Sequence, residues 1–209
     1  MKRHVQVAVF ALMAVAPLLA QQAPKGWKMR VDQSKEASDP DANGSIKFVT
    51  MGTGFHATNP QAAVYWNPMH KVTGNYTLKG TFTLMKPSGH TNYYGLVFGG
   101  ADLDGPKQQY MYFMVAQNGT WLVKMRDGES TSTIAGKSPS EAVKKPDDTG
   151  KSTNALEVRV SAAKIDFVVN GTVVNSTPKM GTADHTNGIY GIRVNHLLEV
   201  HIDGFGLSK

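Results

Sequence analysis

The sequence has no cysteine, and this absence excludes two kinds of stabilisation. Without thiols there is no disulfide framework and no thiolate-bound metal site. Any domain that the chain forms must therefore depend on its hydrophobic core.

Several catalytic and nucleic-acid signatures are also missing. There is no serine nucleophile elbow, no phosphate-binding loop and no His-Glu-x-x-His helix. The net charge is +6, and it falls to +4 without Lys2 and Arg3. The excess is spread along the chain rather than clustered, so nucleic acid is not an expected partner.

One apolar run is long enough to need an explanation. Lys2-Arg3-His4 precedes an apolar segment over residues 5–20 that ends in Ala20. A basic start, an apolar centre and a small final residue are typical of a secretory signal peptide. The alternative is a membrane anchor, but the run is shorter than the roughly 20 residues that span a bilayer. We expect cleavage after Ala20, export to the periplasm or the extracellular space, and no stable membrane insertion afterwards.

The remainder is predicted to be a short linker, residues 21–26, and one domain, residues 27–209. Its dominant pattern is alternation with period two, as in Tyr76, Leu78, Phe82 and Leu84. No convincing amphipathic helix accompanies it. Similar strands are expected at residues 45–51, 54–57, 62–66, 93–100, 110–117, 120–126, 154–160, 164–169, 189–194 and 197–207. This pattern predicts an all-β domain, a β-sandwich with little or no helix.

Two Asn-Gly pairs predict hairpins. Asn118-Gly119 and Asn170-Gly171 lie between apolar runs, and Asn-Gly favours the positive φ values of a two-residue type I′ turn. Such a turn at Asn118-Gly119 places Gln117 opposite Thr120. It puts Trp121 on the core side together with Tyr110, Tyr112, Met114 and Ala116, and it puts Lys124 and Arg126 on the wetter side with Met111, Phe113 and Val115.

Two further segments carry local predictions. In the last strand, Val200 and Ile202 share one parity and Phe205 and Leu207 the other. Both pairs face the core only if Asp203-Gly204 forms a β-bulge. Residues 136–151 are rich in Lys, Pro, Ser and Asp, so we expect a long surface connection with a short helical turn near residues 140–143.

The order of these motifs resembles a known superfamily. Asn-x-Leu-x-Val at residues 154–158, Ile-x-Phe-x-Val-Asn-Gly at 165–171, Gly-x-Tyr-Gly-Ile at 188–192 and Asp-Gly-Phe at 203–205 are similar to the concanavalin A-like lectin/glucanase superfamily. The nearest resemblance is to bacterial secreted domains of the laminin-G-like and 3-keto-disaccharide hydrolase-like kind. It implies a single jelly roll of two curved antiparallel sheets, with ligands on the concave face or the rim loops.

The glucanase branch of that superfamily uses a Glu-x-Asp-x-(x)-Glu strand as acid and nucleophile. None of the five glutamates, Glu36, Glu129, Glu141, Glu157 and Glu199, lies in such a pattern. The mature histidines also lack close metal-ligand spacing, although a site assembled in space from several of them stays open.

Carboxylates suggest structural calcium, although no cofactor is predicted to be required. Asp102 and Asp104 occupy a tight turn, and oxygen-rich turns suit Ca²⁺. By the resemblance, Asp203 occupies a position where related sandwiches often hold calcium. The alternatives are a solvated turn for Asp102 and Asp104 and a side chain that caps the bulge for Asp203.

Sugar binding needs aromatic faces and planar hydrogen-bonding groups. Trp66 is one candidate, and His90, Asn92 and Tyr93 form another at a junction between loop and strand. Lys124 and Arg126 would add donors on the wetter face. The alternatives are core packing for the aromatic residues and plain solvation for the cations.

Three functions follow from these features. The first is an exported, non-catalytic module that binds a glycan or another cell-surface polymer. The second is a hydrolase or lyase that acts on a modified sugar, as the hydrolase-like resemblance implies. The third is a structural or adhesion domain without a small ligand. The sequence indicates no particular oligomeric state.

Overall fold

The computed structural model describes residues 24–34 and 37–208. The expected signal peptide, residues 1–20, lies outside this range. Within it, no helix is both long and apolar enough to cross a membrane.

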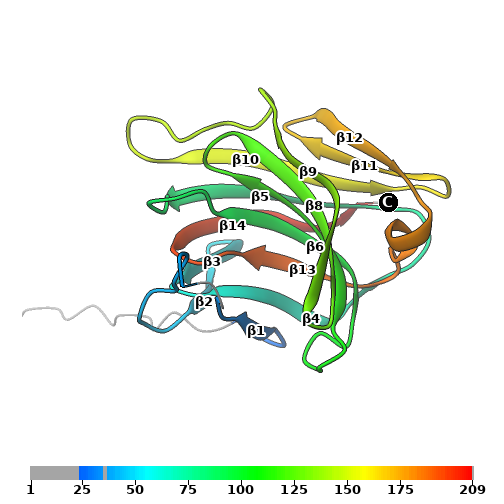
Figure 1. The fold of residues 1–209 in the computed structure, drawn as a ribbon, viewed down its shortest axis with the longest axis horizontal. Coiled ribbons are helices and arrows are strands. Elements are labelled where there is room, and N and C mark those ends of the chain that lie inside the picture. Colours follow the sequence, from blue (N-terminus) through cyan, green and yellow to red (C-terminus); the bar gives the residue numbers. More distant parts are fainter. Residues whose placement is uncertain (1–23, 35–36, 209) are drawn as a thin grey trace, which may run out of the picture.

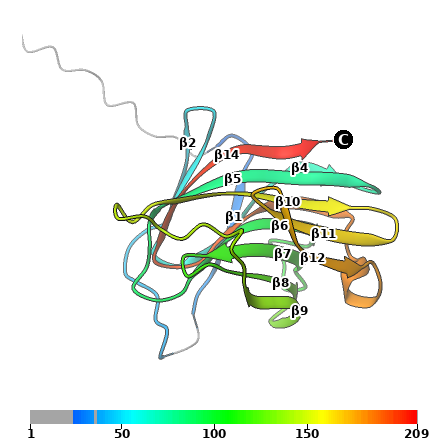
Figure 2. The same ribbon diagram turned by 90° about the horizontal axis from the view of Figure 1, so that it is seen from above.

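Two antiparallel sheets of seven strands each form a β-sandwich (Figures 1 and 2). The first sheet contains, in spatial order, β1 (Lys28–Asp32), β4 (Ala62–Val72), β13 (Gly188–Val194), β6 (Tyr93–Ala101), β7 (Gln109–Ala116), β8 (Thr120–Asp127) and β9 (Ser130–Pro139). The second contains β12 (Thr172–Pro178), β11 (Lys164–Val169), β10 (Ser152–Val160), β5 (Tyr76–Lys86), β14 (Leu198–Ser208), β3 (Gly54–Asn59) and β2 (Lys47–Met51). A 3₁₀ turn at Gly181–Asp184 is the single helical element of the described residues, so the all-β prediction is confirmed.

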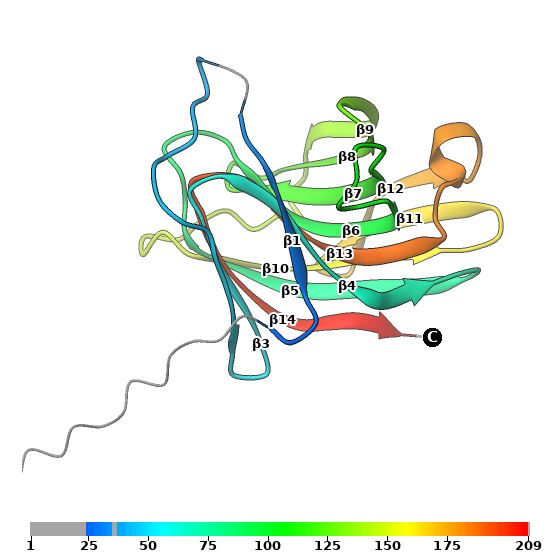
Figure 3. The ribbon, with the colours of Figure 1, turned by 90° about the horizontal axis from the view of Figure 1, so that it is seen from below.

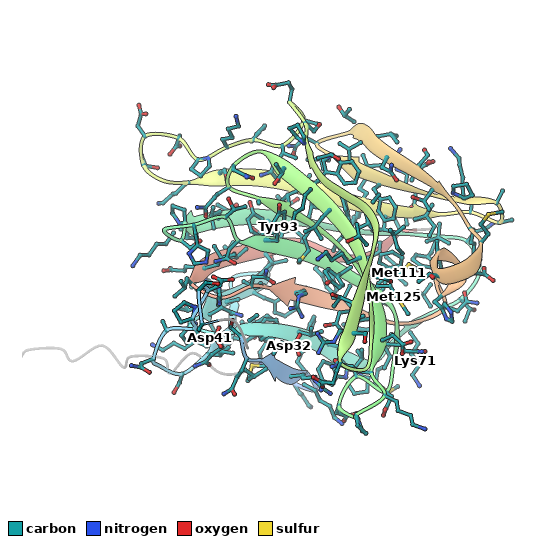
Figure 4. All side chains as sticks on the ribbon, viewed as in Figure 1. Asp32, Asp41, Lys71, Tyr93, Met111 and Met125 are labelled. Atoms are coloured by element: carbon teal, nitrogen blue, oxygen red, sulfur yellow. The ribbon has the colours of Figure 1, made fainter. Side chains whose placement is uncertain are left out.

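The core between the sheets follows from the alternation of the strands. In β5, Tyr76, Leu78, Phe82 and Leu84 are all buried, as their spacing predicts. The first sheet contributes alternate residues of its own strands, including Phe113, whose ring packs 5.1 Å from that of Phe167 across the sandwich. Met111 and Met125, labelled in Figure 4, are partners across β7 and β8 in the same core.

The first sheet also has an apolar cluster on its other face. This outer face, turned away from the second sheet, holds a buried floor that includes Trp66, Tyr93, Tyr110, Tyr112 and Met114. The strands β6 and β7 are therefore buried on both sides along most of their length, which explains why their sequences are apolar nearly throughout.

The two Asn-Gly pairs form different turns. Asn170 and Gly171 both have positive φ, 49° and 83°, and Val169 pairs with Thr172, so the predicted two-residue turn is confirmed there. At Asn118-Gly119 the predicted register is wrong. Val115 pairs with Trp121, and the Gly119 amide donates to the Ala116 carbonyl at 3.0 Å. Only Gly119 has positive φ, 86°, as in a three-residue loop with a glycine in the left-handed region.

The one-residue shift exchanges the faces of β7. Trp121 lies in the core and Lys124 and Arg126 on the outer face, as expected, but Met111, Phe113 and Val115 are the β7 residues that fill the core. Tyr110, Tyr112 and Met114, predicted for the core between the sheets, line the outer face instead.

The bulge in β14 is confirmed. The pairing with β5 shifts by one residue between Asp203 and Gly206, and Gly204 has a φ of 58°. Val200 and Ile202 are fully buried, and Phe205 and Leu207 pack against the same core.

The predicted surface connection begins later than expected. Residues 130–139 form β9, a polar edge strand that pairs with β8, and the connection follows it. Its first part makes the expected turn, since the Val143 amide donates to the Ser140 carbonyl at 3.0 Å. The sequence did not reveal β9 because few of its side chains are apolar.

Candidate functional site

A groove runs over the outer face of the first sheet. Its larger part is a cleft of about 800 Å³, and a neighbouring hollow of about 200 Å³ shares Asp39, Asn92, Arg193 and Asn195 with it. We call the two together the groove. Besides the shared residues, the cleft is lined by Arg30, Val31, Asp32, Gln33, Ser34, Ala62, Arg126, Glu129 and His196, and the hollow by Thr91, Tyr93, Tyr112, Met114, Leu122, Lys124 and Lys137.

Arg193 lines both the cleft and the hollow. It projects from β13 between Ile192 and Val194, which point the opposite way into the core. Its guanidinium donates to the Asp32 carboxylate and, at 2.9 Å, to the Tyr110 hydroxyl. Its Cζ lies 5.3 Å from the centre of the Tyr112 ring, within range of a cation–π interaction. These contacts fix the guanidinium plane in one orientation.

The charge of Arg193 is balanced by Asp32 at the end of β1. Burial alone would raise the pKa of Asp32, but the Arg193 guanidinium, with help from Arg126 and Arg30, holds the pKa below its usual value. The carboxylate is therefore ionised at neutral pH. We call Asp32, Arg193, Tyr110 and Tyr112 the arginine end of the groove.

Tyr110 completes this network as a neutral phenol. Burial raises the pKa of Tyr110 to about 12, so its hydroxyl keeps its proton and donates to Asp32 Oδ2 at 3.3 Å while it accepts from Arg193. Both tyrosines lie on the outer face of the sheet because of the three-residue turn at the end of β7, and Tyr112 lines the hollow.

Two further cations project from β8 into the groove. Burial lowers the pKa of Lys124, and the nearby Lys137 and Arg193 lower it further by repulsion. Arg126 donates through Nε to the Gly128 carbonyl at 2.6 Å. The hollow is thus a cationic region, and hydroxyl-rich or anionic groups are suitable partners for its donors.

Histidines and carboxylates gather where the groove meets three loops. Asp39 lies between β1 and β2, in the blue loop that projects at the upper left of Figure 3, while His90 precedes β6 and His196 follows β13. His90 Nε2 is 2.6 Å from Asp39 Oδ1, and His196 Nε2 is 3.1 Å from the same oxygen. His196 Nδ1 lies 2.8 Å from Asp41 Oδ1. We call Asp39, Asp41, His90 and His196 the histidine end. Asp32 and Asp41, labelled in Figure 4, belong to the two different ends.

The residues predicted to bind sugar are partly brought together. Asn92 and Tyr93 line the groove with Lys124 and Arg126, and His90 lies at the histidine end. Asn92 is 3% exposed, and the Tyr93 hydroxyl is 2.8 Å from Thr120 Oγ1. Trp66 lies on the groove side of β4 but is only 1% exposed, so it packs in the floor and presents no free ring face.

The predicted calcium ligands lie in two separate places. Asp104 forms an ion pair with Lys28 at 2.5 Å, and Asp102 accepts a bond from the Lys107 amide at 3.1 Å. Asp203 lies in the second sheet, where it is 3.1 Å from His201. Within the described part of the chain, none of the three joins a group of three or more potential metal-binding side chains. Calcium at these residues stays a prediction.

Sequence reasoning missed Arg193, Asp32, Asp39 and His196. A charged residue between Ile192 and Val194 in an otherwise apolar strand was the available signal for Arg193. No local pattern connects Asp39 with His196, because 157 positions separate them and loop geometry alone brings them together.

Comparisons by sequence find no matching protein family and no similar curated protein. Solved structures are similar in fold. Carbohydrate binding module CBM66 from Bacillus subtilis is 12% identical, with a TM-score of 0.61 over 88% of this chain and 96% of that one. A Bacteroides ovatus GH16 protein in complex with a G4G4G3G product is 9% identical, with a TM-score of 0.54 over 90% and 97%.

The exoplasmic/lumenal domain of VIP36, in a Ca²⁺/Man3GlcNAc-bound form, is 10% identical, with a TM-score of 0.50 over 88% and 86%. Such identities carry information on fold alone. The fold is the concanavalin A-like jelly roll, as the resemblance in the sequence implied.

Proposed function

We propose that the protein is an exported, non-catalytic module that binds a glycan in the groove. The observation that carries this proposal is the groove itself. Its larger part, about 800 Å³, is lined by guanidinium, amide and carboxylate groups, and the neighbouring hollow adds the rings of Tyr93 and Tyr112. Sugars pair an apolar ring face with hydroxyls, and planar polar groups on rigid strands provide directed hydrogen bonds to those hydroxyls.

The fold supports the same proposal. The similar structures are a carbohydrate binding module, a GH16 protein with its product and a domain bound to Man3GlcNAc. Fold alone does not define function, so the groove residues carry the argument. Export is supported by the sequence pattern of residues 1–20.

A glycan array with the mature protein tests this proposal. We expect binding to a restricted set of glycans, weakened at least about tenfold by Arg126→Ala, the loss of roughly one hydrogen bond to a charged group. Arg159→Ala is the matched control, because Arg159 is an exposed arginine on β10 of the second sheet, paired with Glu157. An array without signal, with and without calcium, would contradict the proposal, as would equal losses in both variants.

The histidine end supports a second candidate, hydrolysis or lyase chemistry on a modified sugar. Two imidazoles and a carboxylate within hydrogen-bond distance can hold and transfer protons. Incubation with each glycan that binds, followed by analysis of products, separates the two candidates. Unchanged glycans support the binding module, and cleaved glycans support the enzyme.

A further inference from the structure

The histidine end brings three potential metal-binding atoms to one point. Asp39 Oδ1, His90 Nε2 and His196 Nε2 come from three different loops, and they all lie within 4.8 Å of one another. The two imidazole nitrogens are 3.1 Å apart. Among the described residues, no other group of three such side chains converges in this way.

The hydrogen bond between His196 and Asp41 leaves the other ring nitrogen of His196, Nε2, as an acceptor. Nδ1 lies 2.8 Å from Asp41 Oδ1, and a carboxylate only accepts, so Nδ1 carries the hydrogen. In an imidazole whose single hydrogen is on Nδ1, Nε2 has a lone pair that can bind a cation. His196 Nε2 lies 3.1 Å from Asp39 Oδ1, and this carboxylate oxygen is also an acceptor.

Nε2 of His90 is likewise an acceptor that lies next to the Asp39 carboxylate. The Asn92 amide nitrogen, a donor, lies 3.0 Å from His90 Nε2, which makes Nε2 an acceptor in this contact. The Asp39 oxygen is only 2.6 Å from the same Nε2. A bound cation would satisfy both nitrogens and the carboxylate at once.

The distances suit a small transition-metal ion. Ligand atoms about 2.0–2.1 Å from tetrahedral Zn²⁺ lie roughly 3.3 Å from one another. The distance between the two imidazole nitrogens and the distance from His196 Nε2 to Asp39 Oδ1 are already 3.1 Å. The distance from His90 Nε2 to Asp39 Oδ1 is 2.6 Å, and a short outward movement of Asp39, whose side chain is 46% exposed, would widen it. Imidazole and carboxylate ligands favour Zn²⁺ and similar ions over Ca²⁺, which takes oxygen ligands.

The surroundings also resemble those of a metal site. A histidine ligand is usually oriented by a carboxylate on its second nitrogen, and Asp41 has this position behind His196. Asp41 is itself held by the Ser34 amide, which donates to its other oxygen at 2.8 Å. The outer side remains open, because His90 and Asp39 are both about half exposed and Asp39 lines the groove.

We infer that Asp39, His90 and His196 bind one divalent transition-metal ion, for which Zn²⁺ is the best match, with a coordination position open to the groove. This inference goes beyond glycan binding and does not depend on it. Three protein ligands and one open position are typical of zinc sites that bind water or a substrate group.

Calorimetric titration of the chelator-treated mature protein with ZnCl₂ tests the inference. We expect one Zn²⁺ per chain, and visible absorption bands of four-coordinate Co²⁺ when cobalt replaces zinc. His90→Ala should weaken Zn²⁺ binding at least about 100-fold. Asp41→Asn should weaken it about 10–100-fold, as expected for a carboxylate that orients a ligand. His90 is suitable for substitution because its ring is about half exposed, so the variant should fold.

His201→Ala is the matched control. His201 is also paired with a carboxylate, Asp203 at 3.1 Å, but it lies on β14 of the second sheet. The absence of stoichiometric Zn²⁺ binding would overturn the inference, and so would an equal loss in His201→Ala and His90→Ala. Zinc binding without any glycan binding would support the metal site while contradicting the proposed glycan function, so the two failures are distinguishable.

Discussion

The two faces of the first sheet are both buried at their centres, but different interactions stabilise them. On the core face, residues such as Phe113 pack against apolar side chains of the second sheet. On the groove face, Tyr110 and Tyr112 lie beside an ion pair, that of Arg193 with Asp32. Alternate residues of one strand, β7, thus serve a core that depends on volume and a groove that depends on charge balance.

This difference indicates how each face should respond to substitution. Loss of volume in the core removes buried area and leaves a cavity. Loss of one charge in the groove leaves its partner without compensation, whereas loss of both charges together costs far less. The distinction predicts a larger loss of stability in the core than in the groove.

The largest effect is expected in the core. Phe113 is fully buried, so Phe113→Ala should lower the free energy of unfolding by about 3–5 kcal/mol. Phe113→Leu keeps most of the volume and should cost less than about 1.5 kcal/mol. Urea denaturation measures both values. A loss below about 1 kcal/mol for the alanine variant would mean that Phe113 does not fill the core and that the observed register of β7 is wrong.

Arg193→Met should cost somewhat less, roughly 2–4 kcal/mol. The substitution leaves the Asp32 carboxylate, 10% exposed, with the more distant Arg30 at 3.6 Å. The double variant Arg193→Met, Asp32→Leu should recover much of this loss, because neither charge then remains. A double-mutant cycle by urea denaturation provides the comparison. If the double variant is less stable than either single one, the groove face depends on volume as the core does.

The same ion pair predicts an acid-dependent stability. The pKa of Asp32 is lowered in the folded protein, so its contribution is complete above the unfolded value of about 3.9. The contribution is lost as the pH falls through the folded pKa. The difference in unfolding free energy between the native protein and Asp32→Asn should therefore be constant near neutral pH and shrink below about pH 4. A difference that does not change under acid conditions would show that Asp32 is not held ionised by Arg193.

The sequence predicted the core better than the groove for a physical reason. Alternation in a strand reports which residues share a face, and Tyr76, Leu78, Phe82 and Leu84 were assigned correctly on that basis. In β7 both parities are apolar, so alternation could not decide which face belongs to the core. The assignment then depended on the turn, and one residue in the loop exchanged Tyr112 with Phe113.

The histidine end shows a second limit. His90 is a candidate from the sequence because it lies next to a strand together with Asn92 and Tyr93, which is a local pattern. Asp39 and His196 meet it only through the fold, across three loops. A periodic pattern carries no information about such contacts.

The smallest predicted effect concerns the turn that orients β7. Asn118 has an ordinary negative φ and accepts bonds from the Thr120 amide at 3.2 Å and its hydroxyl at 2.7 Å, both local. Asn118→Ala should therefore cost about 0.5–1 kcal/mol. Asn170→Ala should cost at least about 1 kcal/mol more, because Asn170 has a φ of 49° and its amide donates to the Ala142 carbonyl and to Asn154 Oδ1. Thermal or urea denaturation of both variants measures the difference. Equal losses would contradict the difference in backbone conformation and side-chain hydrogen bonds between Asn118 and Asn170.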